Sequence, residues 1–316
     1  MPLSTFLGAV LVMVIWGTNF TVIDIGLRSF DPYLLASLRF LLAAVPAVFF
    51  IKRPNVPWRP LLLYGLFFGI GQFGLLFAGM DLGFSAGLAS VVMQLQAFWT
   101  IGLAAGLLGE RVSPRFLVGF AVAAGGMALV AAVTDGSVTA AGTVMVVGAS
   151  LCWGIANLII KKARPDNALA FTVWASLVPP VPLFLMSLGL GGWGTVEHSF
   201  TTMGWTGLGS LLYMVYPAIL FGFALWGHLL RTYRTSRVAP LTLLVPIFGM
   251  TSSVLFLGEP LGALKATAIT LVVLGLVLNQ FDVIGKVRAR RAPRNPGPVP
   301  AGVPCAEVTA EPTKAG

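Results

Sequence analysis

The sequence has few charged residues and almost no cysteine. Charged residues make up 10% of the 316-residue chain and hydrophobic residues 57%, whereas a soluble domain has about 25% charged residues. A soluble protein of this size needs a charged exterior, so the composition excludes an ordinary soluble domain. Cys152 lies in an apolar run and Cys305 near the C-terminus, and two such distant cysteines provide no framework for disulfides or a metal.

The sequence also lacks the motifs of several enzyme classes. It has no CxxC or HExxH motif for a metal and no GxxxxGK[ST] motif for ATP. A membrane enzyme needs a Ser/His, Asp/Asp or metal cluster within the membrane, and none is visible. A signalling subunit needs a soluble domain, whereas every predicted loop is short. We therefore expect no catalysis, no metal and no cofactor, and a transporter is the favoured class.

Long apolar segments account for most of the chain. A helix needs about 20 apolar residues to cross roughly 30 Å of hydrocarbon. Such windows lie near residues 5–26, 33–51, 60–80, 86–108 and 115–132, and again near 140–160, 168–190, 206–229, 238–257 and 263–281. The first window follows no basic segment and is followed by other windows, so it predicts a membrane helix rather than a secretory signal. The sequence predicts an all-α membrane protein with ten transmembrane helices, of which the proline-rich seventh is the most distorted.

The basic residues gather on one side of the predicted membrane. With a cytoplasmic N-terminus, all but three of the 20 Lys and Arg residues fall on the cytoplasmic side: Lys52, Arg53, Arg59, Arg111, Arg115, Lys161, Lys162, Arg164, Arg231, Arg234, Arg237, Lys286, Arg288, Arg290, Arg291, Arg294 and Lys314. Arg28 and Lys265 fall outside, and Arg39 lies within a helix. Cytoplasmic loops carry such an excess of Lys and Arg. The net charge of +9 therefore predicts topology, with both termini cytoplasmic, rather than nucleic-acid binding.

The last residues, 286–316, have a different composition. They are rich in Pro, Gly, Ala and Arg and show no apolar period. Such a segment cannot bury enough apolar surface to fold, so we expect a disordered basic cytoplasmic tail. Its expected role is to set topology, with contact to anionic lipid as an addition.

The two halves of the chain resemble each other. A shift of 149 residues places Leu108-Gly109-Glu110 onto Leu257-Gly258-Glu259 and Gly126 onto Gly275, although chance matches between Leu/Gly/Ala-rich segments remain an alternative. We expect two five-helix repeats, residues 1–135 and 136–285. Because five is odd, the second repeat must enter from the opposite face, so the repeats are inverted. Inverted repeats are characteristic of secondary transporters that alternate access around a midplane site.

Short motifs carry a family resemblance over about residues 1–281. WGTNF at residues 16–20 and WGIAN at 153–157 open the halves, and LGERVS at 108–113 and LGEPLG at 257–262 follow their fourth helices. These motifs resemble the EamA branch of the drug/metabolite transporter superfamily. RFLLAAVPAVFFIKRPNVP, GLASVVMQLQAFWTIGLAAGLLGER and YRTSRVAPLTLLVPIFGM look like its O-acetylserine/cysteine exporter group.

The resemblance implies a ten-helix exporter in the bacterial inner membrane with amino-acid-like cargo such as O-acetylserine or cysteine. Members with similar scaffolds carry sugars, nucleotides, amino acids or drugs, so an unrelated small metabolite, and import instead of export, stay open as alternatives. The partners expected are a small-molecule substrate and the lipid bilayer. A homodimer is left open, and nucleic acid is not expected.

Arg39 is the one basic residue well inside a predicted span. It lies about 10 Å below the outer end of its helix, at 1.5 Å per residue. Charge inside a membrane is usually paired or faces a cavity. Two hypotheses follow: an ion pair with Asp24 near the outer end of the first helix, or a bidentate grip on the carboxylate of an amino-acid-like substrate.

Other polar and aromatic residues lie at mid-membrane on several helices. With Arg39, the candidate substrate-binding residues are Trp16, Asn19, Gln72, Gln96, Trp153, Asn157 and Tyr213. A small-molecule site needs apolar walls with a few convergent polar groups, and the spread of these residues over five helices favours a shared cavity. Hydrogen bonding between neighbouring helices explains each of them singly. Gln94 and Gln96 point in nearly opposite directions, so only one of them is expected to line the cavity.

Three titratable residues at helix ends are candidates for energy coupling. Glu110 and Glu259 occupy equivalent positions in the two repeats, and His228 lies at the cytoplasmic end of the eighth helix. For the carboxylates, capping or an ion pair with a neighbouring helix is the alternative to proton coupling. His228 beside Arg231 is otherwise an interfacial residue. The energy source does not follow from the sequence.

Overall fold

The computed structural model describes residues 3–110, 112–133, 136–233 and 238–289, and these residues form helices and loops without a strand. Eight of their helical segments are long and apolar enough to cross a membrane. Pro32–Val48 and Ala263–Asn279 are shorter apolar helices. The predicted all-α membrane fold is therefore confirmed. Residues 290–316 of the predicted tail lie outside the described residues, as do Arg111, Arg234 and Arg237.

The helices of the first half follow the predicted windows closely. They are α1 (Leu3–Leu27), α2 (Pro32–Val48), a third segment made of α3 (Trp58–Tyr64), η1 (Gly65–Gly74) and α4 (Leu75–Asp81), a fourth made of α5 (Ala86–Val92), η2 (Met93–Leu95) and α6 (Gln96–Leu108), and α7 (Pro114–Ala131). η1 is a π-helix and η2 a 3₁₀-helix. Polar caps start several of these helices; the Asp31 carboxylate, for example, accepts hydrogen bonds from the backbone N–H groups of Tyr33 and Leu34.

The second half repeats this order with one break. Its helices are α8 (Ala140–Ala163), α9 (Ala168–Ala175), α10 (Pro180–Thr202), α11 (Gly204–Tyr213), η3 (Met214–Phe221), α12 (Gly222–Thr232), η4 (Ala239–Leu243), α14 (Leu244–Ser252), η5 (Ser253–Leu257) and α15 (Ala263–Ala289). η3 and η5 are π-helices and η4 is a 3₁₀-helix. α15 runs to Ala289 and so includes the first residues of the predicted tail.

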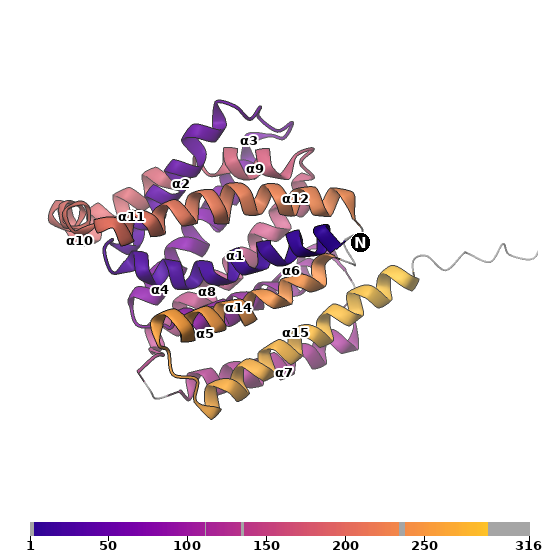
Figure 1. Cartoon of the computed structure of the whole chain (residues 1–316). Coiled ribbons are helices and arrows are strands. Elements are labelled where there is room, and N and C mark those ends of the chain that lie inside the picture. The colour runs from indigo at the N-terminus through magenta and orange to yellow at the C-terminus, as the bar shows by residue number, and fades with distance from the viewer. Residues whose placement is uncertain (1–2, 111, 134–135, 234–237, 290–316) are drawn as a thin grey trace, which may run out of the picture.

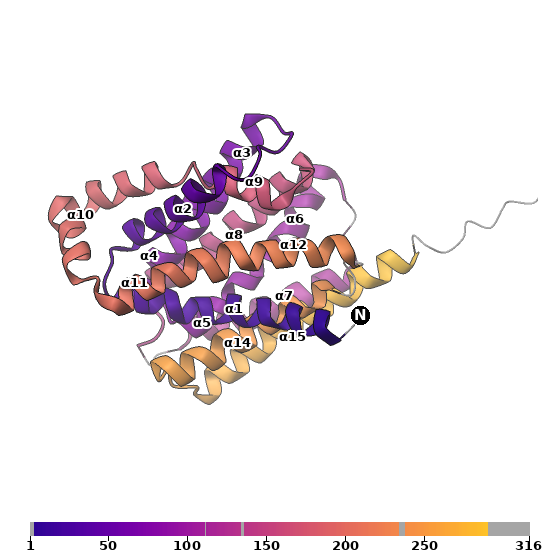
Figure 2. The same ribbon diagram turned by 45° about the horizontal axis from the view of Figure 1, so that its top comes forward.

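The seventh segment differs from the single helix expected at 168–190. It is divided at residues 176–179, because Pro179 and Pro180 have no N–H groups to continue the ladder of α9. α10 then extends to Thr202 through a bend at Gly192, whose φ of 75° lies in the left-handed region. The bend is visible in Figure 2, where α10 runs along the bundle and then turns.

The helices form one bundle, with α7 and α15 side by side along one edge (Figures 1 and 2). The N-terminus of α1 and the C-terminal end of α15 lie at the same end of the bundle. Glycine allows α7 and α15 to approach backbone to backbone: a Cβ atom on Gly119 would lie 2.7 Å from the carbonyl oxygen of Gly275. Small residues permit such contacts between membrane helices.

Substitution of Gly126 tests this packing. A Cβ atom there would lie 2.8 Å from the Ala268 carbonyl oxygen and 2.8 Å from Cγ2 of Val272, whereas adjacent Gly125 has nothing within 4 Å. We expect Gly126→Val to destabilise the purified protein by about 1–3 kcal/mol through overpacking. Gly125→Val should leave the stability near that of the parent. Thermal unfolding in detergent measures both, and an equal effect of the two substitutions would contradict the packing described.

Two equivalent carboxylates hold helix ends in different ways. Glu259 accepts hydrogen bonds from the backbone N–H groups of Ala86 at 2.9 Å and Gly87 at 3.4 Å, and so caps α5 in the other half. Glu110 accepts a hydrogen bond from Lys161 at 2.6 Å, and both side chains are about half exposed. Each carboxylate therefore has a structural partner.

The two contacts predict different energetic costs. Removing a helix cap costs about 0.5–2 kcal/mol, whereas an exposed ion pair contributes about 0–1 kcal/mol. Glu259→Ala should therefore lower the stability of the protein more than Glu110→Ala does. Chemical unfolding of the two variants in the same detergent compares them directly, and a larger loss for Glu110→Ala would reverse our assignment.

Candidate functional site

Arg39 is buried among aromatic rings in the interior of the bundle. Its side chain lies on α2 with 3% exposure. The guanidinium carbon lies 3.8 Å from the centroid of the Phe73 ring, 5.7 Å from that of Phe40 and 5.9 Å from that of Phe77. An aromatic face attracts a cation by about 0.5–2 kcal/mol. These three rings form what we call the aromatic box.

The aromatic box does not satisfy the hydrogen-bonding groups of Arg39. Its Nε and Nη1 atoms are buried and have no hydrogen-bond partner among the described residues. Asp24, the partner considered from the sequence, instead forms an ion pair with Arg28 at 3.1 Å, one turn away on the same helix. The guanidinium keeps its charge in proteins, so two charged donors point into the interior unpaired.

The helices that position Arg39 are locally irregular. α2 packs against both η1 and η3, the long π-helical segments of the two halves. π-helical turns are rare and are frequent at functional sites. In η1 they set Phe68 and Phe73 so that their rings contact each other with centroids 5.3 Å apart, and both rings contact Phe40. The helix that carries Arg39 is thus packed against π-helical segments of both halves.

Two further predicted residues carry buried polar atoms without partners. The side-chain oxygen of Asn19 on α1 and that of Gln72 on η1 accept no hydrogen bond from the described residues. An unsatisfied buried acceptor costs about 1–3 kcal/mol. Ser187 Oγ, on α10, is likewise buried and has no hydrogen-bond partner among the described residues. Asn19, Arg39 and Gln72 are therefore the predicted site residues whose polar groups remain available.

Trp16 and Tyr213 have their polar groups engaged between helices. Trp16 donates from Nε1 to the carbonyl oxygen of Ala218 at 3.0 Å. The Tyr213 hydroxyl donates to the carbonyl oxygen of Ile15 at 3.1 Å and lies 2.6 Å from the Thr18 hydroxyl. These bonds join α1 to η3 and to α11, as the helix–helix alternative expects.

The remaining three predicted residues lie between α6 and α8. Asn157 donates from Nδ2 to Oε1 of Gln96 at 2.6 Å and to Oγ1 of Thr100 at 3.1 Å. Trp153 is half-buried and packs against the main hydrophobic core. Gln94 is 7% exposed and is the glutamine that does not contact α8 through this network. That Gln96, Trp153 and Asn157 bind substrate stays a prediction.

The coupling candidates lie away from the aromatic box. Glu110 and Glu259 have the helix-end partners described above. His228 is exposed near the end of α12, and its Nε2 lies 3.5 Å from the Thr232 hydroxyl. A role of these three residues in coupling stays a prediction.

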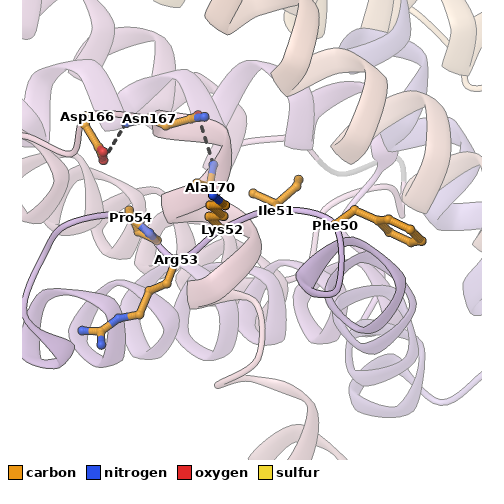
Figure 3. A pocket seen from close by; sticks show the side chains of 8 residues that line it. All are labelled: Phe50, Ile51, Lys52, Arg53, Pro54, Asp166, Asn167 and Ala170. Atoms are coloured by element: carbon orange, nitrogen blue, oxygen red, sulfur yellow. Dashed lines mark hydrogen bonds between the residues drawn. The ribbon is translucent and has the colours of Figure 1, made fainter.

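A surface pocket lies at one end of the bundle, apart from these residues. It has a volume of about 340 Å³ and is lined by Phe50, Ile51, Lys52, Arg53, Pro54, Asp166, Asn167 and Ala170. Figure 3 shows Phe50 and Arg53 pointing to opposite sides of it. The backbone N–H of Asn167 donates a hydrogen bond to the Asp166 carboxylate, and the Asn167 side-chain oxygen accepts one from the backbone N–H of Ala170. It contains none of the predicted site residues.

The sequence analysis missed the aromatic box. Phenylalanine is common in apolar spans, so Phe40, Phe73 and Phe77 carry no signal of their own. A weak signal is present: Phe73 and Phe77 lie four residues apart, and Phe40 follows Arg39 directly. Rings four residues apart on a helix share a face, but the sequence does not say which helix that face meets.

The comparisons with known proteins agree on one family. The model of the EamA-like transporter family matches residues 3–132 and 140–281. The chain is similar to a "Probable amino-acid metabolite efflux pump" of Salmonella typhimurium, with 41% identity over 92% of this chain and 97% of the relative. A protein of Escherichia coli with the same description is 41% identical over 87% of this chain and 94% of the relative.

A solved crystal structure supports the same fold. It superposes with a TM-score of 0.60 at 17% identity and covers 92% of this chain and 99% of that one. At this identity the likeness concerns the fold alone. With the family match over nearly all of the membrane-spanning part, the chain belongs to the EamA-like transporter family and is a multi-pass membrane transporter, not an enzyme.

Proposed function

We propose that this protein exports small amino-acid-like metabolites, with O-acetylserine and cysteine as cargo, across the bacterial inner membrane by alternating access. The observation that carries the proposal is Arg39, a buried cation with two unpaired donors in the middle of the bundle. A guanidinium is shaped for bidentate binding of a carboxylate, the group that all amino-acid-like cargo shares. The descriptions of the two 41% identical relatives, which mention amino-acid metabolites, support this cargo class.

The transport mechanism we propose uses two inverted five-helix repeats. The eight long apolar helical segments and two shorter ones supply the ten spans. Backbone irregularities support the repeat: π-helices begin at Gly65 and Met214, and left-handed glycines follow helices at Gly109 and Gly258. Both pairs are separated by the 149 residues that relate the halves in sequence. These matched backbone features support the repeat that we propose.

Transport into everted vesicles tests the cargo and the role of Arg39 together. We expect saturable uptake of labelled O-acetylserine and cysteine by vesicles that contain the protein. Arg39→Gln should reduce it at least about tenfold, since a hydrogen bond to a charged group contributes about 1.5–3 kcal/mol. Arg28→Gln, which removes the exposed ion pair with Asp24, is the matched control and should transport normally.

The outcomes of this assay separate cargo from binding residue. Without saturable uptake of either compound the cargo is wrong, although the family stands. If Arg39→Gln transports as well as the parent, Arg39 does not bind the carboxylate. Loss of an unpaired buried charge should not lower the stability of the protein, so unfolding of Arg39→Gln is not the expected reason for lost transport.

The orientation we propose places both termini in the cytoplasm. In a background in which Cys152 and Cys305 are serine, Glu197→Cys and Lys162→Cys report opposite ends of the bundle, and both positions are exposed. A membrane-impermeant maleimide should label Glu197→Cys in intact spheroplasts and Lys162→Cys only after permeabilisation. The reverse pattern would invert the topology, and labelling of both in intact spheroplasts would place residues 162 and 197 on the same side of the membrane and exclude a single span between them.

A further inference from the structure

The interior also holds two unpartnered hydrogen-bond acceptors, which complement the donors of Arg39. These are the side-chain oxygens of Asn19 and Gln72, with exposures of 7% and 3% for the two residues. We propose that they bind the α-ammonium group of the cargo, so that the site selects zwitterions with a free amino group and an uncharged side chain. This inference rests on the proposed transport function and deepens it.

The packing of α1 against α2 brings Asn19 to the level of Arg39. A Cβ atom on Gly26 would lie 2.9 Å from Leu35, which fixes where the two antiparallel helices touch. Asn19 lies two turns before Gly26 on the same face of α1, and Arg39 lies one turn after Leu35 on the same face of α2. At 1.5 Å per residue, these displacements are about 10 and 6 Å in the same direction. The two residues therefore lie at similar depths, roughly 4 Å apart along the helix axes.

The π-helix η1 carries Gln72 close to the aromatic box. Gln72 precedes Phe73, whose ring lies against the guanidinium of Arg39. It also shares a face with Phe68, one turn away, and the Phe68 ring contacts Phe40 beside Arg39 and Phe223 across the interior, at 6.4 Å between centroids. Since α1, α2 and η1–α4 pack on one another, the three available groups come from three mutually contacting helices.

The chemistry of these groups matches a zwitterion. A guanidinium binds a carboxylate with parallel N–H bonds, and an ammonium has three N–H donors and no acceptor. Amide oxygens accept from an ammonium without adding charge to the interior. No carboxylate of the described residues hydrogen bonds with or forms an ion pair to Arg39, Asn19 or Gln72. A second cationic group on the cargo would therefore have no counter-charge in the site, and nothing would offset the free energy of its desolvation.

If the two amides had a purely structural role, we would expect their oxygens to be hydrogen bonded. Amides that hold helices together are hydrogen bonded, as Gln96 and Asn157 are at 2.6 Å. The side-chain oxygens of Asn19 and Gln72 accept no hydrogen bond, so variants with apolar side chains of similar size at these positions should be at least as stable as the parent. Asn19→Leu and Gln72→Met are therefore variants in which lost function does not follow from lost structure.

Competition against labelled cysteine uptake in everted vesicles provides the test. L-cysteine should compete at least about tenfold better than N-acetyl-L-cysteine, which lacks the ammonium, and than L-cysteine methyl ester, which lacks the carboxylate. The double variant Asn19→Leu/Gln72→Met should lose most of its preference for L-cysteine over the N-acetyl compound while keeping its preference over the ester. Ser187→Ala, which removes an equally unpartnered atom elsewhere, is the control and should keep both preferences.

The possible results distinguish this inference from the proposed function. Equal competition by L-cysteine and N-acetyl-L-cysteine in the parent protein would overturn the ammonium site while saturable cysteine uptake upholds the exporter. A double variant that keeps the parent's preference for the free amine would also overturn it. Absence of saturable uptake of both cysteine and O-acetylserine would instead remove the proposed cargo, and the inference with it.

Discussion

The structure depends on one constraint: a polar group inside hydrocarbon must find its partner within the protein, because lipid offers none. Many polar side chains in the spans obey it by donating to a carbonyl oxygen of their own helix, as Ser210 does to Gly207, and others bond to another helix. The Thr21 and Ser252 hydroxyls, for example, lie 2.7 Å apart between α1 and α14. These bonds join segments that are far apart in sequence and so hold the bundle together. Against this background the unpartnered groups of Asn19, Arg39 and Gln72 stand out, and we propose that they bind a ligand.

The sequence predicted the helices well, because hydrocarbon thickness alone sets their length. The window at 86–108 coincides with α5 to α6, which run from Ala86 to Leu108. It also indicated Asn19, Arg39 and Gln72 as site candidates, since polar residues are rare in apolar runs, and the structure shows that each has a buried polar atom without a partner. It could not choose the partner of Asp24, because Arg28 and Arg39 both lay within reach and the choice depends on the rotation of α1 against α2. The sequence could not predict the aromatic box either, because it also depends on how the helices are rotated against one another.

The π-helical segments of both halves lie against the helix that carries the buried charge. η1 and η3 both pack against α2, the helix that carries Arg39. A π-helical segment is wider than an α-helix and turns neighbouring side chains away from their α-helical directions. η1 contributes the Phe73 ring, which lies against the guanidinium, while Phe40 of α2 and Phe77 of α4 complete the aromatic box. The rings lower the energy of the cation without using its N–H donors, which is what a binding group needs before its ligand arrives.

The close contact between α7 and α15 has a consequence for biogenesis. α7 ends at Ala131 and α15 begins at Ala263, and α7 packs mainly against α15. A ribosome that adds about 5–20 residues per second begins α15 roughly 7 to 26 seconds after it completes α7. During that interval the glycine face of α7 is covered by lipid or by the translocon. This edge of the bundle can therefore close only as the last helix leaves the ribosome.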